Sequence, residues 1–145
     1  MIAGRYSLLE QGALDDALPA ATETGRSIVA VGVFNSGLLA TQEVPDDARY
    51  NYAPAPPDVL RRAREIAAIC KEHGTTLPAA AVAFPLRHPA VAAIAVGMRT
   101  AREVRRNVEL YSAGVPHELW DALIDARLVR PQHDLPGKER FHAGI

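Results

Sequence analysis

The sequence has 145 residues, 48% of them hydrophobic, and its 16 basic and 17 acidic side chains give a formal net charge of -1. This length suits one domain with its own core, and the near-neutral charge argues against a nucleic-acid surface. No apolar run approaches the roughly 20 residues of a membrane helix, no signal peptide is recognisable, and the lone cysteine permits a reducing compartment, so we expect a cytoplasmic protein.

The first part of the chain predicts two strands, a helix and a long loop. Residues 1–9 predict a short strand and its exit, and apolar residues at helical spacing predict a helix over 12–24, which Pro19 should end or kink. Residues 27–33 are apolar without alternation, which is typical of a parallel strand buried on both faces. Residues 40–57 contain four prolines and predict a loop, and a loop of this length is usually functional or mobile.

Two helices are predicted next. The clearest covers 58–73, where apolar residues share one face and Gly74 stops the helix. A second, alanine-rich helix over 77–86 can be capped by Thr76 and ends before Pro89.

The last part predicts a strand, two helices and a tail. Residues 91–96 form another apolar run typical of a buried strand, and a helix is predicted over 100–111. A final helix begins at Val115, and residues 131–145 lack an apolar period, which predicts a disordered tail. The helix over 100–111 is expected to turn three apolar side chains inward: Val104, Val108 and Tyr111.

The order of these elements predicts an α/β fold with parallel strands. The residues alone leave open whether the strands form an open sheet or a piece of a barrel. Three strands are few for either arrangement, because a three-stranded parallel sheet leaves both of its edges unpaired.

The turn before the helix over 100–111 is the strongest local candidate for a binding site. The strand ends at Gly97, Arg99 follows, and Thr100 opens the helix. The N–H groups and positive dipole end of a helix start attract phosphate, and an arginine fork can close on an anion. Thr100 and Glu103 also fit a capping box, with Glu103 reaching back to the Thr100 N–H. Most such turns only cap a helix, so both interpretations stay open here.

Four segments, taken in order, resemble the C-terminal part of an aldo-keto reductase. They are residues 3–11 (Ala-Gly-Arg-Tyr-Ser-Leu-Leu-Glu-Gln), 31–39 (Val-Gly-Val-Phe-Asn-Ser-Gly-Leu-Leu), 96–100 (Val-Gly-Met-Arg-Thr) with Glu103, Val104 and Asn107, and 115–120 (Val-Pro-His-Glu-Leu-Trp). Each segment alone is a weak signal, whereas four in order at plausible spacing are a strong one. The details resemble the branch of aldose and galactose dehydrogenases.

This resemblance implies that residues 1–130 are the C-terminal portion of a (β/α)8 TIM barrel, with its sixth to eighth strands and the helices that follow them. It also implies a nicotinamide dinucleotide, NAD or NADP, bound by the loops after strands seven and eight. The family has no glycine-rich Rossmann turn, and this sequence has none either. The residues that match cofactor-binding positions of the family are Phe34, Asn35, Ser36, Gly37, Leu38, Gly97, Met98, Arg99, Thr100, Glu103 and Asn107.

The matched positions imply individual roles, each with a plainer alternative. Arg99 would supply charge to a phosphate, or it is a solvated loop arginine. Glu103 matches a position where many NADP-preferring members carry arginine, so its carboxylate would repel a 2′-phosphate and accept from ribose hydroxyls, which favours NAD. The alternative for Glu103 is capping alone. Asn107 would contact adenine or lie on the surface, and Gly37 would line the pyrophosphate or only permit a turn.

Other candidate residues are weaker. Arg5 and Tyr6 lie where the family's sixth strand meets the nicotinamide, although Tyr6 fits a core position equally well. Cys70 sits on an apolar helix face, so packing is favoured over a role as nucleophile. The five histidines lack metal-ligand spacing, so we expect no metal site.

The resemblance also implies what this chain lacks. The family transfers hydride between nicotinamide and a carbonyl or sugar substrate, with a tyrosine, a lysine, an aspartate and a histidine placed on earlier strands. No residue here matches those four, so we assign no catalytic residue. One interpretation is the cofactor-binding part of an NAD(P)-dependent enzyme that acts on an aldose, aldehyde or ketone. A second interpretation is a non-catalytic nucleotide-binding or assembly module, which would pair with an N-terminal half-barrel or with a second copy of itself. A third is an inactive truncated remnant.

Overall fold

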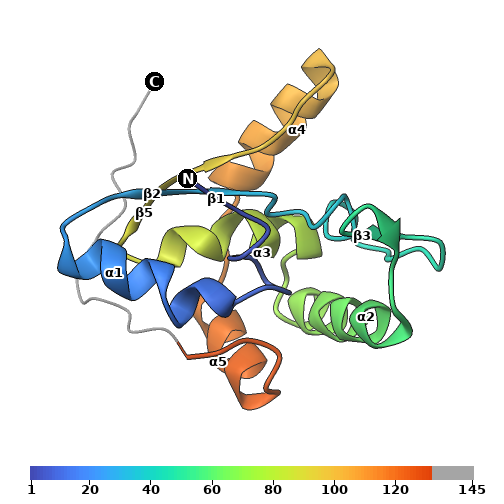
Figure 1. Cartoon of the computed structure of the whole chain (residues 1–145). Helices are drawn as coiled ribbons and strands as arrows, with labels where there is room; N and C mark the ends of the chain where they lie inside the picture. Colours follow the sequence, from blue (N-terminus) through green and yellow to red (C-terminus); the bar gives the residue numbers. More distant parts are fainter. Residues whose placement is uncertain (132–145) are drawn as a thin grey trace.

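Three parallel strands and the helices that join them make up the structure, a computed structural model that describes residues 1–131 (Figure 1). The strands β1 (Ile2–Ala3), β2 (Ile28–Val31) and β5 (Val91–Ala95) form one sheet in the order β1-β2-β5. Both neighbouring pairs are parallel, which confirms the predicted α/β class. The tail predicted over 131–145 lies outside the described residues, apart from Pro131.

The helices lie on one side of the sheet, except for one that extends beyond it. The remaining elements, in chain order, are η1 (Gly12–Leu14), α1 (Ala17–Glu23), the short strands β3 (Arg49–Tyr50) and β4 (Ala53–Pro54), α2 (Pro57–Glu72), α3 (Leu77–Ala83), η2 (Pro85–Arg87), α4 (Ala101–Ser112) and α5 (His117–Asp125). In Figure 1, α1, α2, α3 and α5 lie below the sheet, whereas α4 (orange) rises above it. Over the part of the chain that the structure describes, no helix has both the length and the apolar character of a membrane span.

The two central helices confirm their sequence predictions, because their start signals act as expected. α2 carries Pro57 in its first turn, where a missing N–H is not needed for the helical ladder. α3 begins after Thr76, whose hydroxyl accepts the Ala79 N–H at 3.3 Å. Beyond Ala83 the predicted second helix tightens into η2 instead of continuing as α-helix.

The helix predicted over 12–24 is shorter than expected. Residues Gly12–Leu14 form the separate 3-10 turn η1, and α1 starts only after Asp16, whose carboxylate accepts the Ala17 N–H at 2.5 Å. Pro19 therefore falls in the first turn of α1, where its missing N–H leaves no intrahelical bond unmade. The prediction that Pro19 ends or kinks the helix is wrong, because it assumed a helix that starts five residues too early.

The strands β2 and β5 are not buried on both faces, as their sequences predicted. In β2, Ala30 is fully buried whereas Val29 and Val31 are only half-buried. In β5, Val91 is buried but Ala93 is exposed. Unbroken apolar runs are typical of strands covered on both sides, and among the described residues helices cover this sheet on one side.

The orientation of α4 is also different from the prediction. Val104, Val108 and Tyr111 were expected to face inward, but their side chains are 43%, 58% and 61% exposed. The half-buried side of α4 carries Asn107 and Leu110 instead. Periodicity identified the apolar stripe correctly, but it could not reveal that no other described element covers that stripe.

A small hairpin interrupts the segment 40–57, which was predicted to be a loop. Strands β3 and β4 pair antiparallel across Asn51 and Tyr52, which have φ of 49° and 67°. Both central residues at positive φ are typical of the tight turns that suit a hairpin. The turn lies beside the segment after β2, because the Tyr52 N–H contacts the Ser36 hydroxyl at 3.4 Å.

The core contains a chain of aromatic rings. Phe84 is fully buried, with its ring centroid 5.3 Å from Tyr6 and 6.1 Å from Trp120. The guanidinium of Arg87 lies 4.5 Å from the centre of the Trp120 ring, a cation–π contact. These contacts join the segment after β1, the end of α3 and helix α5 into one core.

Candidate functional site

The candidate site depends on two segments that leave the sheet at the same edge. β2 and β5 are parallel neighbours, with Ala30 opposite Ile94 and Val31 opposite Ala95. Because parallel strands run in the same direction, the segments that follow them emerge together at the carboxyl edge of the sheet. The sequence predicted this neighbourhood for residues 34–38 and 97–100, and the strand pairing confirms it.

The segment after β2 presents a mixture of buried and accessible groups. Phe34 is half-buried against the core, while Ser36 and Gly37 are exposed. Asn35 and Leu38 are 4% and 1% exposed. The Leu38 side chain is therefore part of the core, and a ligand at this segment would meet its backbone.

Asn35 is the most unusual residue of this segment. It has φ of 47°, and the following Ser36 has φ of 59°, a left-handed conformation that Asn tolerates better than most residues. Its Oδ1 accepts a hydrogen bond from the Ser7 hydroxyl at 2.7 Å. Its Nδ2 is buried without a hydrogen-bond partner. A buried amide donor left unpaired costs on the order of 1–3 kcal/mol, so it is available to an acceptor from a ligand.

Ser7 was not identified from the sequence. It follows β1 and is 1% exposed, and its hydroxyl also accepts the N–H groups of Leu9 and Glu10 at 3.3 and 3.1 Å. A signal was present, since Ser7 and Asn35 both follow strands that were predicted to be parallel. The resemblance implied that these two strands are neighbours, and the pairing of β1 with β2 agrees with this, but it did not reveal that these two side chains meet.

The turn after β5 is open to solvent. Its residues Gly97, Met98, Arg99 and Thr100 are all exposed. Thr100 caps α4 as predicted, because its hydroxyl accepts the Glu103 N–H at 3.2 Å. Arg99 directly precedes the cap of this helix, so an exposed arginine and a helix start are neighbours in the chain, a combination that anions favour.

Glu103 already places a carboxylate at this turn. Its Oε2 accepts the Arg99 N–H at 2.6 Å. This hydrogen bond, together with the Thr100 N–H and the charge of Arg99, holds the pKa of Glu103 below its ordinary value. The Thr100 half of the predicted capping box is therefore confirmed, whereas the hydrogen bond that Glu103 accepts comes from the Arg99 N–H instead of the predicted Thr100 N–H. The ionised carboxylate would repel a second anion placed against it.

An arginine within α4 connects this helix to the segment after β2. Arg106 donates from Nη2 to the carbonyl of Ala40 at 2.8 Å, just beyond the segment after β2. The next residue, Asn107, is half-buried. The sequence predicted a role for Asn107 but not for Arg106, whose long-range backbone contact leaves no local pattern.

Arg5 and Tyr6, the two weaker candidates near β1, both have partners within the chain. Arg5 pairs with the exposed Asp16 at 2.8 Å. Tyr6 is 1% exposed and its ring lies 6.0 Å from that of His88, edge to face, in addition to the Phe84 contact. Tyr6 is therefore a core residue in this structure.

Cys70 and the metal-type side chains form no reactive site in the described region. Burial raises the pKa of the Cys70 thiol to about 12, so the nucleophilic thiolate is disfavoured. Within residues 1–131, His, Cys, Asp and Glu side chains do not gather in groups of three or more that could hold a metal ion.

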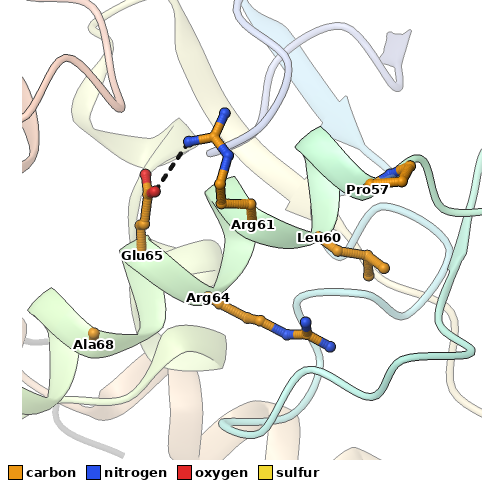
Figure 2. A pocket seen from close by; sticks show the side chains of 6 residues that line it. All are labelled: Pro57, Leu60, Arg61, Arg64, Glu65 and Ala68. Atoms are coloured by element: carbon orange, nitrogen blue, oxygen red, sulfur yellow. Dashed lines mark hydrogen bonds and ion pairs between the residues drawn. The ribbon is translucent and has the colours of Figure 1, made fainter.

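A separate pocket of about 430 Å³ lies on the outward face of α2 (Figure 2). Figure 2 shows Arg61 and Glu65 paired across one helical turn, at 3.0 Å. The Arg64 side chain extends away from that pair and donates to the carbonyl of Val44 at 3.2 Å. Because one helix supplies all the lining residues and its charged groups have partners within the chain, the pocket is not part of the candidate site.

Comparisons with known proteins agree with the resemblance read from the sequence. A family model described as Aldo/keto reductase family matches residues 1–126. The chain is 45% identical over 129 residues to a D-threo-aldose 1-dehydrogenase of Pseudomonas sp and 40% identical over 129 residues to a pyridoxal 4-dehydrogenase of Microbacterium luteolum. These matches cover 89% of this chain but only 39% and 37% of the two relatives.

A solved structure supports the fold. The glycerol dehydrogenase of Gluconobacter oxydans superimposes with a TM-score of 0.63 at 23% identity. The superposition covers 94% of this chain and 44% of that protein. The chain thus spans less than half the length of the proteins that it resembles.

Proposed function

Because this chain belongs to the aldo/keto reductase family, we propose that it is the cofactor-binding C-terminal part of an NAD(P)-dependent oxidoreductase. The observation that carries the proposal is the parallel pairing of β2 with β5, which brings residues 34–38 and 97–100 to one edge. In barrels of this type, the loops after the seventh and eighth strands and a helix start commonly bind phosphate.

The residues at this edge fit a dinucleotide. The exposed Arg99 and the start of α4 suit a phosphate, and Asn107 lies half-buried beyond them. The unpaired Nδ2 of Asn35 suits an acceptor oxygen of the same ligand. The bound cofactor would supply the hydride chemistry, while these groups would hold and orient it.

We propose NAD rather than NADP as the preferred cofactor. The Glu103 carboxylate is held in its ionised form at the start of α4. An ionised carboxylate accepts hydrogen bonds from ribose hydroxyls, as acidic residues do in other NAD sites, and it repels the additional phosphate of NADP.

The substrate proposed for the complete enzyme is an aldose, aldehyde or ketone. The two relatives, an aldose dehydrogenase and a pyridoxal dehydrogenase, are consistent with a carbonyl or sugar substrate. No residue of this chain is proposed as catalytic, so the groups that move the proton must come from the rest of the barrel. A cytoplasmic location stays part of the proposal, supported by the single, free and buried cysteine.

Replacing Arg99 by alanine should weaken NADH binding about tenfold, because a charge-assisted hydrogen bond to phosphate is lost. The measurement is a fluorescence titration of the chain with NADH. Arg105→Ala is the matched control, since it removes an exposed arginine within α4 without touching the turn. An Arg99→Ala titration that superimposes on that of the unchanged chain would remove this turn from the site.

Replacing Glu103 by arginine should shift the ratio of the NADP and NAD dissociation constants about tenfold toward NADP, because a repelling charge becomes an attracting one. Glu103→Gln separates charge from capping, since its amide oxygen can still accept the Arg99 N–H. Glu109→Arg makes the same charge change on an exposed position of α4 away from the turn. Equal shifts for Glu103→Arg and Glu109→Arg would show that position 103 has no special role.

A further inference from the structure

The hydroxyl group of Ser7 is fully used within the chain. It donates to Asn35 Oδ1 at 2.7 Å, and its oxygen accepts the N–H groups of Leu9 and Glu10. A hydroxyl offers one donor and two acceptor positions, so all three positions of Ser7 are occupied. Ser7 and Asn35 are only 1% and 4% exposed, which means that water does not compete for these bonds.

This arrangement fixes the direction in which the Asn35 amide points. If the amide were rotated, Nδ2 would meet an oxygen whose acceptor positions are already taken, and the Ser7 proton would have no acceptor. Oδ1 therefore stays on Ser7, and Nδ2 stays buried without a partner. Among the described residues, the Ser7 hydroxyl is the single hydrogen-bond partner of the Asn35 side chain.

The backbone around Asn35 is in a conformation that needs support. Asn35, Ser36 and Gly37 have φ of 47°, 59° and 94°, so three consecutive residues are left-handed. This conformation is unfavourable for residues other than glycine, and it persists where the surrounding structure holds it. Ser36 and Gly37 are exposed whereas Asn35 is buried, so the hydrogen bond from Ser7 anchors this run of residues at its buried end.

The left-handed run also determines which backbone donors of the segment stay available. Five of its N–H groups donate to carbonyls of residues 32–37: those of Asn35, Gly37, Leu38, Leu39 and Ala40. The N–H of Ser36 has no acceptor within the described part of the chain, and Ser36 is exposed. The segment is therefore folded by its own hydrogen bonds, and its open donor is placed by the conformation of Asn35.

We propose that Ser7 is a positioning residue for cofactor binding, which acts through Asn35 to hold residues 34–38 in this conformation. The inference rests on the proposed function and deepens it, because Ser7 follows β1 and lies outside the predicted site residues. Its hydroxyl has no hydrogen-bonding position left for a ligand, so its effect on binding is indirect. A segment that is already ordered raises affinity, since the ligand does not have to order it.

Hydrogen exchange of the chain without cofactor tests whether Ser7 holds the segment. In Ser7→Ala, the amides of Leu38 and Leu39 should exchange about fivefold faster than in the unchanged chain, the factor that corresponds to one hydrogen bond. These amides donate to the carbonyls of Asn35 and Phe34, so they report on the conformation of the segment. Asn35→Gly breaks the same hydrogen bond, tolerates the left-handed backbone and leaves the turn around Ser7 intact. It should show the same change, and it decides the question if Ser7→Ala does not fold.

NADH titration tests the role of Ser7 in binding. Ser7→Ala should raise the Kd for NADH about fivefold, because the segment is no longer held in its binding conformation. Since Ser7 acts through Asn35, Ser7→Ala should have no further effect on Kd once Asn35 is replaced by glycine. Thr22→Ala is the matched control, because it removes a hydroxyl that donates within α1 to the Leu18 carbonyl. It should leave both the Kd and the exchange of the segment unchanged.

Two results would overturn the inference. The first is equal exchange of the Leu38 and Leu39 amides in the unchanged chain and in Asn35→Gly. The second is additive effects of Ser7→Ala and Asn35→Gly on the Kd for NADH, since Ser7 would then act by another route. A chain that does not bind NADH contradicts the proposed function, whereas the exchange experiment needs no cofactor and still decides whether Ser7 holds the segment.

Discussion

Replacing Phe84 by alanine should lower the free energy of unfolding by about 4 kcal/mol, the cost of removing a large buried aromatic side chain. Phe84 is 0% exposed and contacts both Tyr6 and Trp120. Its removal would leave a cavity where three separate segments of the chain meet. Urea unfolding followed by the fluorescence of Trp120, the chain's one tryptophan, measures the change.

Tyr52→Ala is the matched control for the Phe84 variant. Tyr52 is also aromatic but is 89% exposed at the tip of the hairpin, so its removal should change the stability by less than about 0.5 kcal/mol. A Phe84→Ala protein as stable as the Tyr52→Ala protein would contradict the aromatic core described above.

Replacing Arg62 by alanine should lower the free energy of unfolding by about 3 kcal/mol. The half-buried guanidinium of Arg62 donates to the carbonyls of Leu9 at 3.1 Å, Leu8 at 3.4 Å and Leu128 at 2.5 Å. It thereby ties α2 to the segment after β1 and to the segment after α5. In the Arg62→Ala variant, these three carbonyl groups lose a charged hydrogen-bond donor at a site that is only partly accessible to water.

The neighbouring Arg61 provides the comparison for this effect. Arg61 pairs with Glu65 across one turn of the same helix, and both side chains are largely exposed, so Arg61→Ala should cost less than about 0.5 kcal/mol. Urea unfolding of both variants separates the two roles. Equal urea midpoints for the two variants would mean that the three hydrogen bonds from Arg62 to backbone carbonyls stabilise the fold no more than a surface ion pair does.

Local signals were sufficient to predict most of the secondary structure. Pro57 and Thr76 start α2 and α3 because their effects act within one helical turn. The apolar runs at 28–31 and 91–95 are strands, and their parallel pairing follows from the helices between them. The family resemblance is confirmed as well, because it rested on several short motifs in a fixed order.

The errors concern three features that hydrophobic periodicity and composition do not encode: what a helix face meets, an unusual turn and the exact start of a helix. The stripe of α4 was predicted to face inward because periodicity reports that residues share a face, without reporting what that face meets. The hairpin at 49–54 was missed because Tyr52 at positive φ is an unusual turn residue. Pro19 was misread because the true start of α1 depends on the Asp16 cap.

In the candidate site, too, contacts between residues close in sequence could be predicted, whereas contacts between distant residues could not. Thr100 and Glu103 lie three residues apart, so the Thr100 cap could be predicted from spacing alone, although Glu103 accepts the Arg99 N–H and not the Thr100 N–H that was predicted. The Ser7–Asn35 hydrogen bond spans 28 residues and exists only because β1 and β2 are neighbours. Spacing along the chain carries no information about such a contact until the order of the strands is known.

The buried position of Cys70 determines how oxidants act on this protein. Cys70 is the chain's single thiol, and it faces the interior from α2. A thiol-specific reagent can therefore react with Cys70 only after α2 has separated locally from the elements packed against it. The rate of labelling therefore measures how often α2 opens locally. Cys70 can serve as a probe of local unfolding without any introduced cysteine.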